Sequence, residues 1–266
     1  MEPQSPSIRA CKRIFEKGSI YFVTNESLSQ VDCKLIFNET LPLYICDPKQ
    51  ETLYKPSSLV QVNNTTSLPV SFRFGGSLVF IFTDEVYPSI AEPVNYQVEL
   101  KLINDGWKYC TRRTYTIGKH EFEVNGNVAA SCLPIKLGDW QSLLGTAFSG
   151  DVQYLVEFDC SDDVASRGAV LDLGDVKYCC TVELNDKALG RAAWQPYAFP
   201  IAGMLKAGSN ILKITVTNTM ANQFIANKGL EKWSISKIGP YHLVSLEFEA
   251  ESLTSGLFGP VTIKGK

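Results

Sequence analysis

The feature that most constrains the fold is the alternation of apolar and polar residues, with a period of two, in many short segments. Val152, Tyr154, Val156 and Phe158 would share one face of a strand, while Glu157 would lie on the opposite face. The same pattern recurs in residues 180–184, 212–216 and 244–248. Strands with one apolar and one polar face are typical of antiparallel sheets that bury a single side.

Helix signals hardly occur in the sequence. No segment longer than about ten residues carries apolar residues at helical spacing, and residues 201–205 offer one turn at most. Turn residues punctuate the chain at short intervals, at Asn185-Asp186, 206–210 and Gly239-Pro240. We therefore expect an all-β protein built as a sandwich or jelly roll. A βα-barrel is excluded because it needs eight strand-helix units.

The chain is long enough for two ordinary domains, because 266 residues with 45% hydrophobic content can form a core in each. A first set of strands is predicted at residues 20–23, 33–37, 59–62 and 72–82. We expect a small β-sandwich over residues 1–90, connecting strands over 91–134, and the second module over 135–266.

The connecting segment carries the pattern of a β-hairpin. Apolar residues alternate over residues 96–102 and resume at residues 107–109. Between them, Asn104, Asp105 and Gly106 tolerate the positive φ angles of a tight turn. We expect the two segments to pair, without a basis for assigning them to either module.

The charge of the chain is nearly balanced. Lys and Arg total 25 against 28 Asp and Glu, and the formal net charge of -3 shows no basic cluster of the kind that binds nucleic acid or anionic lipid. The longest apolar runs, such as residues 78–82, are far shorter than the ~20 residues of a membrane helix. We expect a neutral partner and no membrane-spanning segment. Residues 1–6 lack the basic and apolar stretches of a secretory signal, so they do not support export.

Eight cysteines are present, and none is spaced as C-x-x-C. In a chain of this length we expect mostly buried free thiols rather than a disulfide framework. The histidines are His120 and His242, so neither a histidine-rich zinc site nor a histidine-dependent catalytic triad is predicted.

The second module contains phrases that resemble a known family. Leu137-Gly138-Asp139-Trp140, the segment 171–176 and the ending Ser255-Gly256-Leu257-Phe258-Gly259-Pro260-Val261 resemble the galactose-binding-like jelly roll at the end of family 106 glycoside hydrolases, the α-L-rhamnosidase-like enzymes. The middle of this region is equally similar to the sugar-binding domain of family 2 enzymes such as β-glucuronidases. The resemblance implies two β-sandwich modules, the second a galactose-binding-like jelly roll.

Two features limit what the resemblance carries over. Leu155 follows Tyr154 where these domains usually have an Arg, so a polar contact would be lost while alternation turns Leu155 away from the core. Family 106 enzymes place their catalytic carboxylates on a barrel before the sandwiches, and the sequence at Met1 already resembles the sandwich region. We therefore expect either a fragment or a free-standing module, with no catalytic residues. The family is often exported.

Sugar binding uses an aromatic face against the pyranose ring, with amides reaching the hydroxyls. The sequence offers these candidates: Trp140, Trp194, Tyr197, Trp233, Asn218, Asn222 and Gln223. Packing is the favoured role for Trp194, whereas both roles stay open for Tyr197 because its hydroxyl favours a wet edge.

The carboxylates offer no catalytic pair. Asp172 and Asp175, like the loop residues Asp162 and Asp163, are expected to be solvated turns or caps. No cofactor is required. A structural calcium ion is a further hypothesis, because Asp159, Asp162 and Asp163 can supply the hard oxygen ligands that calcium takes in galactose-binding-like domains.

Three functions remain open from the sequence. The first is a non-catalytic accessory region of an α-L-rhamnosidase-like glycoside hydrolase, which binds carbohydrate or supports a catalytic barrel in cis or in trans. The second is a free-standing lectin-like module that binds a sugar by itself. The third is a structural module without sugar affinity, which predicts a large exposed apolar patch.

Overall fold

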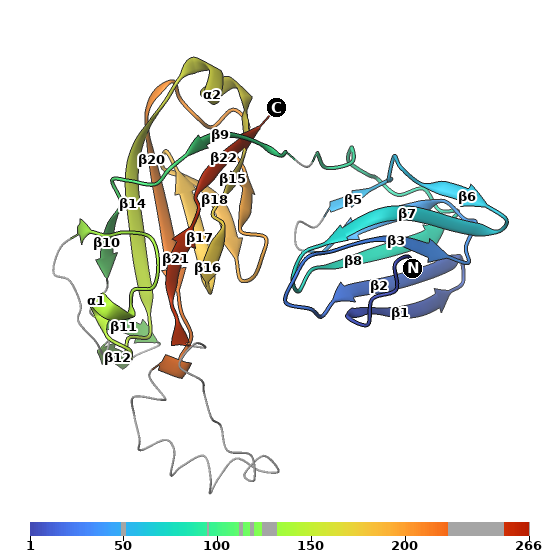
Figure 1. The fold of residues 1–266 in the computed structure, drawn as a ribbon, viewed down its shortest axis with the longest axis horizontal. Helices are drawn as coiled ribbons and strands as arrows, with labels where there is room; N and C mark the ends of the chain where they lie inside the picture. The colour runs from blue at the N-terminus through green and yellow to red at the C-terminus, as the bar shows by residue number, and fades with distance from the viewer. Residues whose placement is uncertain are drawn as a thin grey trace, which may run out of the picture. The chain divides into compact units, whose positions relative to one another are not determined.

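The computed structural model describes residues 1–48, 52–94, 96–111, 114–117, 120–123, 132–222 and 253–265. The chain divides into two compact units, Met1–Asn95 and Tyr96–Lys266. Both consist almost entirely of antiparallel β-sheet, as Figure 1 shows, so the predicted all-β sandwich class is confirmed. Among the described residues, no helix is long and apolar enough to cross a membrane.

The first unit contains two antiparallel sheets. One has the strand order β1-β2-β8-β4-β5 and the other β3-β7-β6. Their bounds are β1 Ile8–Phe15, β2 Gly18–Asn25, β3 Val31–Phe37, β4 Leu43–Asp47, β5 Thr52–Tyr54, β6 Val60–Val62, β7 Thr65–Phe72 and β8 Ser77–Thr83. Alternate residues of both sheets meet in one core that includes Val23, Leu35, Phe37, Phe80 and Phe82.

The second unit has a six-stranded sheet, β13-β10-β14-β20-β17-β18, and a four-stranded sheet, β19-β15-β22-β9, with two short pairs, β16-β21 and β11-β12. Their bounds are β9 Val98–Leu102, β10 Lys108–Thr111, β11 Thr114–Ile117, β12 His120–Glu123, β13 Leu133–Pro134, β14 Asp151–Cys160, β15 Gly168–Asp172, β16 Asp175–Lys177, β17 Cys179–Leu184, β18 Lys187–Ala192, β19 Ala198–Pro200, β20 Gly208–Thr217, β21 Gly256–Gly259 and β22 Thr262–Gly265. The described residues of this unit also form two short helices, α1 (Gln141–Leu144) and α2 (Asp162–Arg167).

The core of the second unit follows the period-two pattern of the sequence. On β14, Val152, Tyr154 and Val156 are buried, and β20 and β17 place their own alternate apolar residues beside them. Leu155 lies on the other face of β14, half-buried, between Lys108 of β10 and Lys213 of β20 in the strand register. The predicted orientation of Leu155 is therefore confirmed.

The predicted hairpin over residues 96–109 is wrong. β9 pairs with β22 in the four-stranded sheet, whereas β10 pairs with β13 and β14 in the six-stranded sheet. The connection crosses from one sheet to the other, and it buries Ile103 and Trp107 in the core between them. The indole Nε1 of Trp107 donates to the Ile103 carbonyl at 3.2 Å. The turn residues predicted a hairpin from local sequence alone. Burial of Ile103 and Trp107 between the two sheets, which local sequence does not encode, favours the crossing connection instead.

Two further expectations need correction. Cys110 and Cys132 form a disulfide, and Cys11 and Cys179 are exposed, so the cysteines are not mostly buried free thiols. Asp162 and Asp163 lie in the first turn of α2 instead of a loop, because Ser161 caps this helix by accepting a hydrogen bond from the Val164 amide. The predicted strand at 244–248 lies outside the described residues.

Candidate functional site

Three of the predicted sugar-binding residues converge on one place in the second unit, around the segment Leu253–Ser255. The Trp140 amide donates to the Ser255 carbonyl at 2.9 Å. The Asn218 side-chain amide donates to Ser255 Oγ at 3.1 Å, and that of Asn222 donates to the Leu253 carbonyl at 2.9 Å. We call Trp140, Asn218, Asn222, Leu253 and Ser255 the Ser255 cluster.

The Ser255 cluster joins three stretches of chain that are far apart in sequence. Asn218 also receives a hydrogen bond from the Gly150 amide and donates to the Phe148 carbonyl. Asp139 Oδ1 accepts from the amides of Gln141 and Ser255 at 3.0 and 3.2 Å. Most of the side-chain polar atoms that a sugar would need are thus hydrogen-bonded to backbone groups of the protein. The cluster therefore links these segments inside the fold.

The aromatic ring of Trp140 is part of the core and not a platform for a sugar. It is 1% exposed, stacks on Tyr154 with ring centroids 6.3 Å apart, and contacts Phe148 edge-on. Tyr154 is also fully buried, and its hydroxyl accepts from the Leu257 amide at 3.2 Å. Burial raises the pKa of Tyr154 above its usual range. Among the described residues, Trp140 Nε1 and Asn222 Oδ1 are buried atoms without a hydrogen-bond partner.

Trp194 and Tyr197 lie apart from the Ser255 cluster in sequence, in the segment between β18 and β19, and they differ in exposure. Trp194 is 59% exposed, although packing was its favoured role. Tyr197 is 5% exposed and donates its hydroxyl to the Tyr178 carbonyl at 2.6 Å, so it does not sit at a wet edge. Burial raises the pKa of Tyr197. Of the predicted platforms within the described chain, Trp194 alone presents a largely exposed ring.

The proposed calcium ligands do not come together. Asp159 lies on β14, Asp162 and Asp163 open α2, and Asp163 pairs with Arg167 at 3.0 Å. Across the described ranges, no group of three or more His, Cys, Asp and Glu side chains is placed to hold a metal ion. The carboxylates at the start of α2 instead lie where the helix dipole favours negative charge.

A glycosidase needs a carboxyl group whose pKa is raised so that it can act as a general acid. In the part of the chain that the structure describes, the carboxyl groups with a shifted pKa all have a lowered one. These are Asp32, Glu39, Glu85 and Asp186. Hydrogen bonds to the carboxylate cause each net shift, which favours the charged form. None of these groups is therefore tuned to donate a proton.

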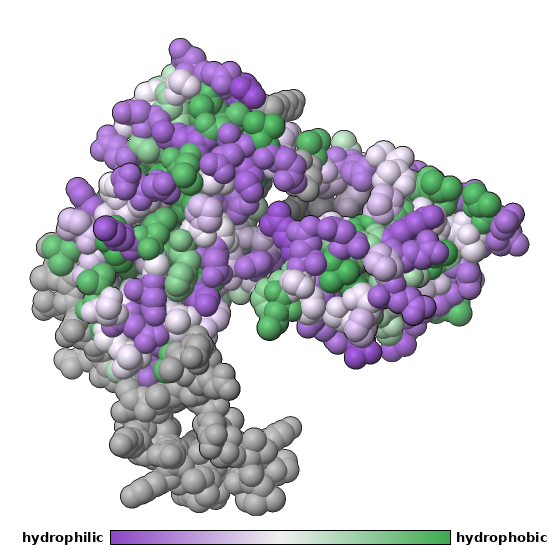
Figure 2. Space-filling view, in the orientation of Figure 1, coloured by the Kyte–Doolittle hydropathy of each residue, from purple (hydrophilic) through white to green (hydrophobic). Residues whose placement is uncertain are grey.

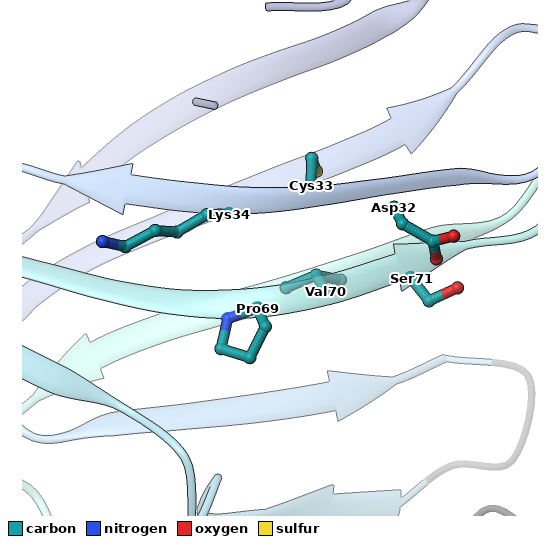
Figure 3. Close-up of a pocket in the computed structure, with 6 residues that line it drawn as sticks. All are labelled: Asp32, Cys33, Lys34, Pro69, Val70 and Ser71. Carbon is teal, nitrogen blue, oxygen red and sulfur yellow. The ribbon is translucent and has the colours of Figure 1, made fainter. Parts of the chain in front are cut away.

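A shallow hollow on the first unit is lined by paired residues of the neighbouring strands β3 and β7 (Figure 3). Asp32 and Ser71 lie side by side at one end of it, whereas Lys34 points toward the other end. Hydrogen bonds from Ser71 and Gln30 lower the pKa of Asp32. The lining contains one carboxylate and no aromatic ring, so it offers neither an acid-base pair nor a stacking surface for a sugar.

Apolar residues on the surface are interspersed with polar ones on the face that Figure 2 shows. The edge strand β6 of the first unit exposes Val60 and Val62, at 55% and 57%, and apolar surface is visible at that end of the unit in Figure 2. In the second unit, the exposed apolar side chains include Leu102, Trp194 and Met220. Scattered exposure of this kind is ordinary for a protein surface.

Glycines have a role that was not predicted in the phrases that carry the family resemblance. A Cβ added at Gly256 would lie 2.2 Å from the Gly138 carbonyl oxygen, and one at Gly174 would lie 2.2 Å from the Gly259 oxygen. Gly138 and Gly174 belong to two of the quoted phrases, and Gly256 and Gly259 to a third. These phrases are therefore points of close approach between two backbones. The glycines in these phrases were the sequence signal that could have predicted the close approach.

Trp233, Gln223 and His242 lie outside the described residues, as do the side-chain surroundings of His120. The remaining predicted positions are all described. The structure brings together Trp140, Asn218 and Asn222, and the bonds that they make serve the fold.

The chain is similar to proteins named as a rhamnosidase and as β-glucuronidases. No family model matches the chain. The "Putative beta-glucuronidase" of Formosa agariphila is 28% identical over 139 residues, which cover 44% of this chain and 12% of that protein. The rhamnosidase from Novosphingobium sp. PP1Y is similar in structure, with a TM-score of 0.67 at 19% identity over 96% of this chain and 23% of that protein. The β-glucuronidase of Bifidobacterium dentium is 20% identical over 47% of this chain and 21% of that protein, with a TM-score of 0.35.

The chain thus spans less than a quarter of the length of each of these relatives. The likeness to the rhamnosidase covers nearly the whole chain and concerns the fold. The structural neighbours of this two-unit β-sandwich chain include a rhamnosidase and β-glucuronidases.

Proposed function

We propose that this chain is a non-catalytic accessory region of an α-L-rhamnosidase-like glycoside hydrolase, whose two sandwiches support a separate catalytic barrel. The observation that carries the proposal is the likeness to the rhamnosidase. It takes in 96% of this chain and 23% of that protein. A region that corresponds to about one quarter of an enzyme has the size of an accessory part.

The carboxyl groups of the described residues support a non-catalytic role. Hydrolysis of a glycoside uses two carboxyl groups on either side of the bond, one of them with a raised pKa. Among the described carboxyl groups, those with a shifted pKa all have a lowered pKa. One of them, Glu39, forms an ion pair with Lys12 and accepts hydrogen bonds from Ser19 and Tyr21 in the first unit. Such a carboxylate stabilises a fold and has no proton to give.

Support of a barrel fits the second unit better than capture of a sugar. A lectin-like site needs aromatic faces and amides that are open to solvent. Trp140 and Tyr197 are buried, and the side-chain amides of Asn218 and Asn222 donate to groups of the protein itself. These residues stabilise the fold of the second unit itself, which argues against sugar capture at these positions.

Activity of the purified chain is the first test. We expect no release of nitrophenol from nitrophenyl α-L-rhamnoside or nitrophenyl β-D-glucuronide, with an authentic rhamnosidase and an authentic glucuronidase as positive controls. Turnover that co-purifies with the chain and survives a second, independent purification would overturn the proposal.

The second test concerns the separate barrel. The DNA that flanks the coding sequence should encode a barrel, either in frame or as a neighbouring gene. The barrel should lose thermal stability or activity when this region is deleted from it. A barrel that keeps both without this region would count against a supporting role.

A free-standing lectin-like module is the second candidate, and the exposed ring of Trp194 is the observation that favours it. Calorimetry with rhamnose, galactose and pectic fragments distinguishes the two. The leading proposal predicts no heat of binding. Heat that disappears in Trp194→Ala, and persists in the matched variant Leu143→Ala at another exposed apolar position, would establish the lectin-like function instead.

A further inference from the structure

The disulfide between Cys110 and Cys132 lies at the edge of the six-stranded sheet. β13 pairs with β10 in the register Tyr109 to Leu133 and Lys108 to Pro134. One step further along this antiparallel ladder, Cys110 and Cys132 face each other with their Cα atoms 4.4 Å apart. The disulfide therefore links the next pair of residues in the β10-β13 ladder covalently, beyond the two pairs that the strands form.

Few other contacts hold β13 to the sheet. The strand has two residues, both exposed, and Pro134 has no amide hydrogen to donate. The next residue, Ile135, donates its amide to the Trp107 carbonyl at 3.0 Å. Because two exposed residues bury little apolar surface, the covalent bond supplies much of the attachment of β13.

Two described strands lie in sequence between the cysteines of the disulfide. Cys110 and Cys132 are 22 residues apart. β11 and β12 lie between them and pair with each other, and with no other strand that the structure describes.

The position of the disulfide makes it open to thiol exchange. Cys132 is exposed and Cys110 is half-buried, so a small thiol can approach the sulfur of Cys132. By contrast, Cys33 and Cys160 are buried free thiols, and burial raises their pKa values, which suppresses the reactive thiolate. Thiol exchange is therefore favoured at this edge over these two buried thiols.

We propose that the Cys110–Cys132 disulfide is a redox-responsive clip that fixes β13 to the edge of the sheet. A dithiol reductant breaks the sulfur-sulfur bond in two exchange steps. Its two protons end on the sulfurs of Cys110 and Cys132, and the dithiol becomes a cyclic disulfide. The edge then opens while the rest of the second unit stays folded, and an oxidised dithiol reverses the reaction. The clip is independent of the proposed accessory function.

Hydrogen exchange of the full chain, with and without dithiothreitol, tests the clip. The Ile135 amide reports on β13 because it bonds to Trp107, and the Val156 amide on β14 reports on the sheet. Reduction should speed exchange at Ile135 by about 100-fold, the order set by the loop-closure entropy of a segment of this length. Exchange at Val156 should not change.

Variants separate the clip from general effects of the reductant. The double variant Cys110→Ser/Cys132→Ser should exchange like the reduced wild type and ignore dithiothreitol. Cys179→Ser, at an exposed free cysteine, should behave like the wild type. If the double variant does not fold, the exchange rates of Ile135 and Val156 in oxidised and reduced wild type still test the proposal.

Three results would overturn the proposal. Non-reducing peptide mapping could find Cys110 and Cys132 as free thiols. The exchange rate of Ile135 could be the same in both redox states. Reduction could also abolish protection at Val156, in which case the disulfide would be a staple of the whole unit and not a local clip.

Discussion

Replacing Gly256 by alanine tests whether the recognised phrases are points of close backbone approach. Gly256 has a φ of 145°, which L residues rarely adopt, and its added Cβ would lie 2.2 Å from the Gly138 carbonyl oxygen. The Gly138 amide donates to the Leu257 carbonyl at 2.7 Å, and the Leu257 amide donates to the Tyr154 hydroxyl. The extra methyl group must therefore displace one of two backbones that are already hydrogen-bonded.

The cost can be worked out from these contacts. The unfavourable φ contributes about 1–2 kcal/mol. Moving the backbone of Gly138 away weakens two buried hydrogen bonds around Leu257, at about 1 kcal/mol each. The expected loss for Gly256→Ala is thus about 3–4 kcal/mol, which lowers the melting temperature of a unit of this size by roughly 10 °C.

Gly203→Ala is the matched control. Gly203 has a φ of 72° and nothing within 4 Å of an added Cβ, so its variant carries the conformational cost alone, about 1 kcal/mol. Differential scanning calorimetry of the full chain, with the two units resolved as separate transitions, gives both values. Equal losses for Gly203→Ala and Gly256→Ala would refute the close approach, as would a loss that falls on the transition of the first unit.

The other predictions concern hydrogen bonds in both units. Hydrogen bonds from Lys12 and neighbouring hydroxyls outweigh the opposing effect of burial and lower the pKa of Glu39 below 4.5, so its stabilisation of the first unit is complete above that pH and is lost as the pH falls through the lowered pKa. Urea unfolding should therefore show a deficit for Glu39→Gln at pH 7 that shrinks toward pH 3, and a deficit independent of pH would contradict the ion pair. Tyr154→Phe should cost about 1–3 kcal/mol in the second unit because it leaves the buried Leu257 amide unpaired, and unchanged thermal unfolding would exclude that bond. Asn25→Ala should cost a similar amount, about 1–3 kcal/mol, in the first unit, since the buried side-chain amide donates to three backbone carbonyls; chemical denaturation of the variant gives the value.

The fold class could be predicted from local sequence because burial of one sheet face leaves a period-two record. Val152, Tyr154 and Val156 alternate with polar or half-buried residues, and the structure buries these three. This signal needs no knowledge of the strand's neighbours, since a strand with one buried face has the same pattern in any antiparallel sheet. The orientation of Leu155 followed from the same rule.

The helix α2 shows a different limit. Its Ser161 cap, acidic first turn and final Arg167 were present in the sequence, but six residues are too few to show helical periodicity. A search for capping residues would have identified it. The buried position of Tyr197 had no such signal, because its hydroxyl pairs with the carbonyl of Tyr178, 19 residues earlier in the chain.

The sequence by itself determined that this protein is built of antiparallel sheets, and it marked the phrases that carry the resemblance to glycoside hydrolases. Only the tertiary structure decided that β9 and β10 belong to different sheets, that Cys110 faces Cys132, and that Asn218 and Asn222 bond to Ser255 and Leu253. The physical reason is the range of the interactions. Alternation reflects burial of a single strand, whereas pairing depends on the register between segments far apart in the chain, and burial of the whole sandwich selects that register.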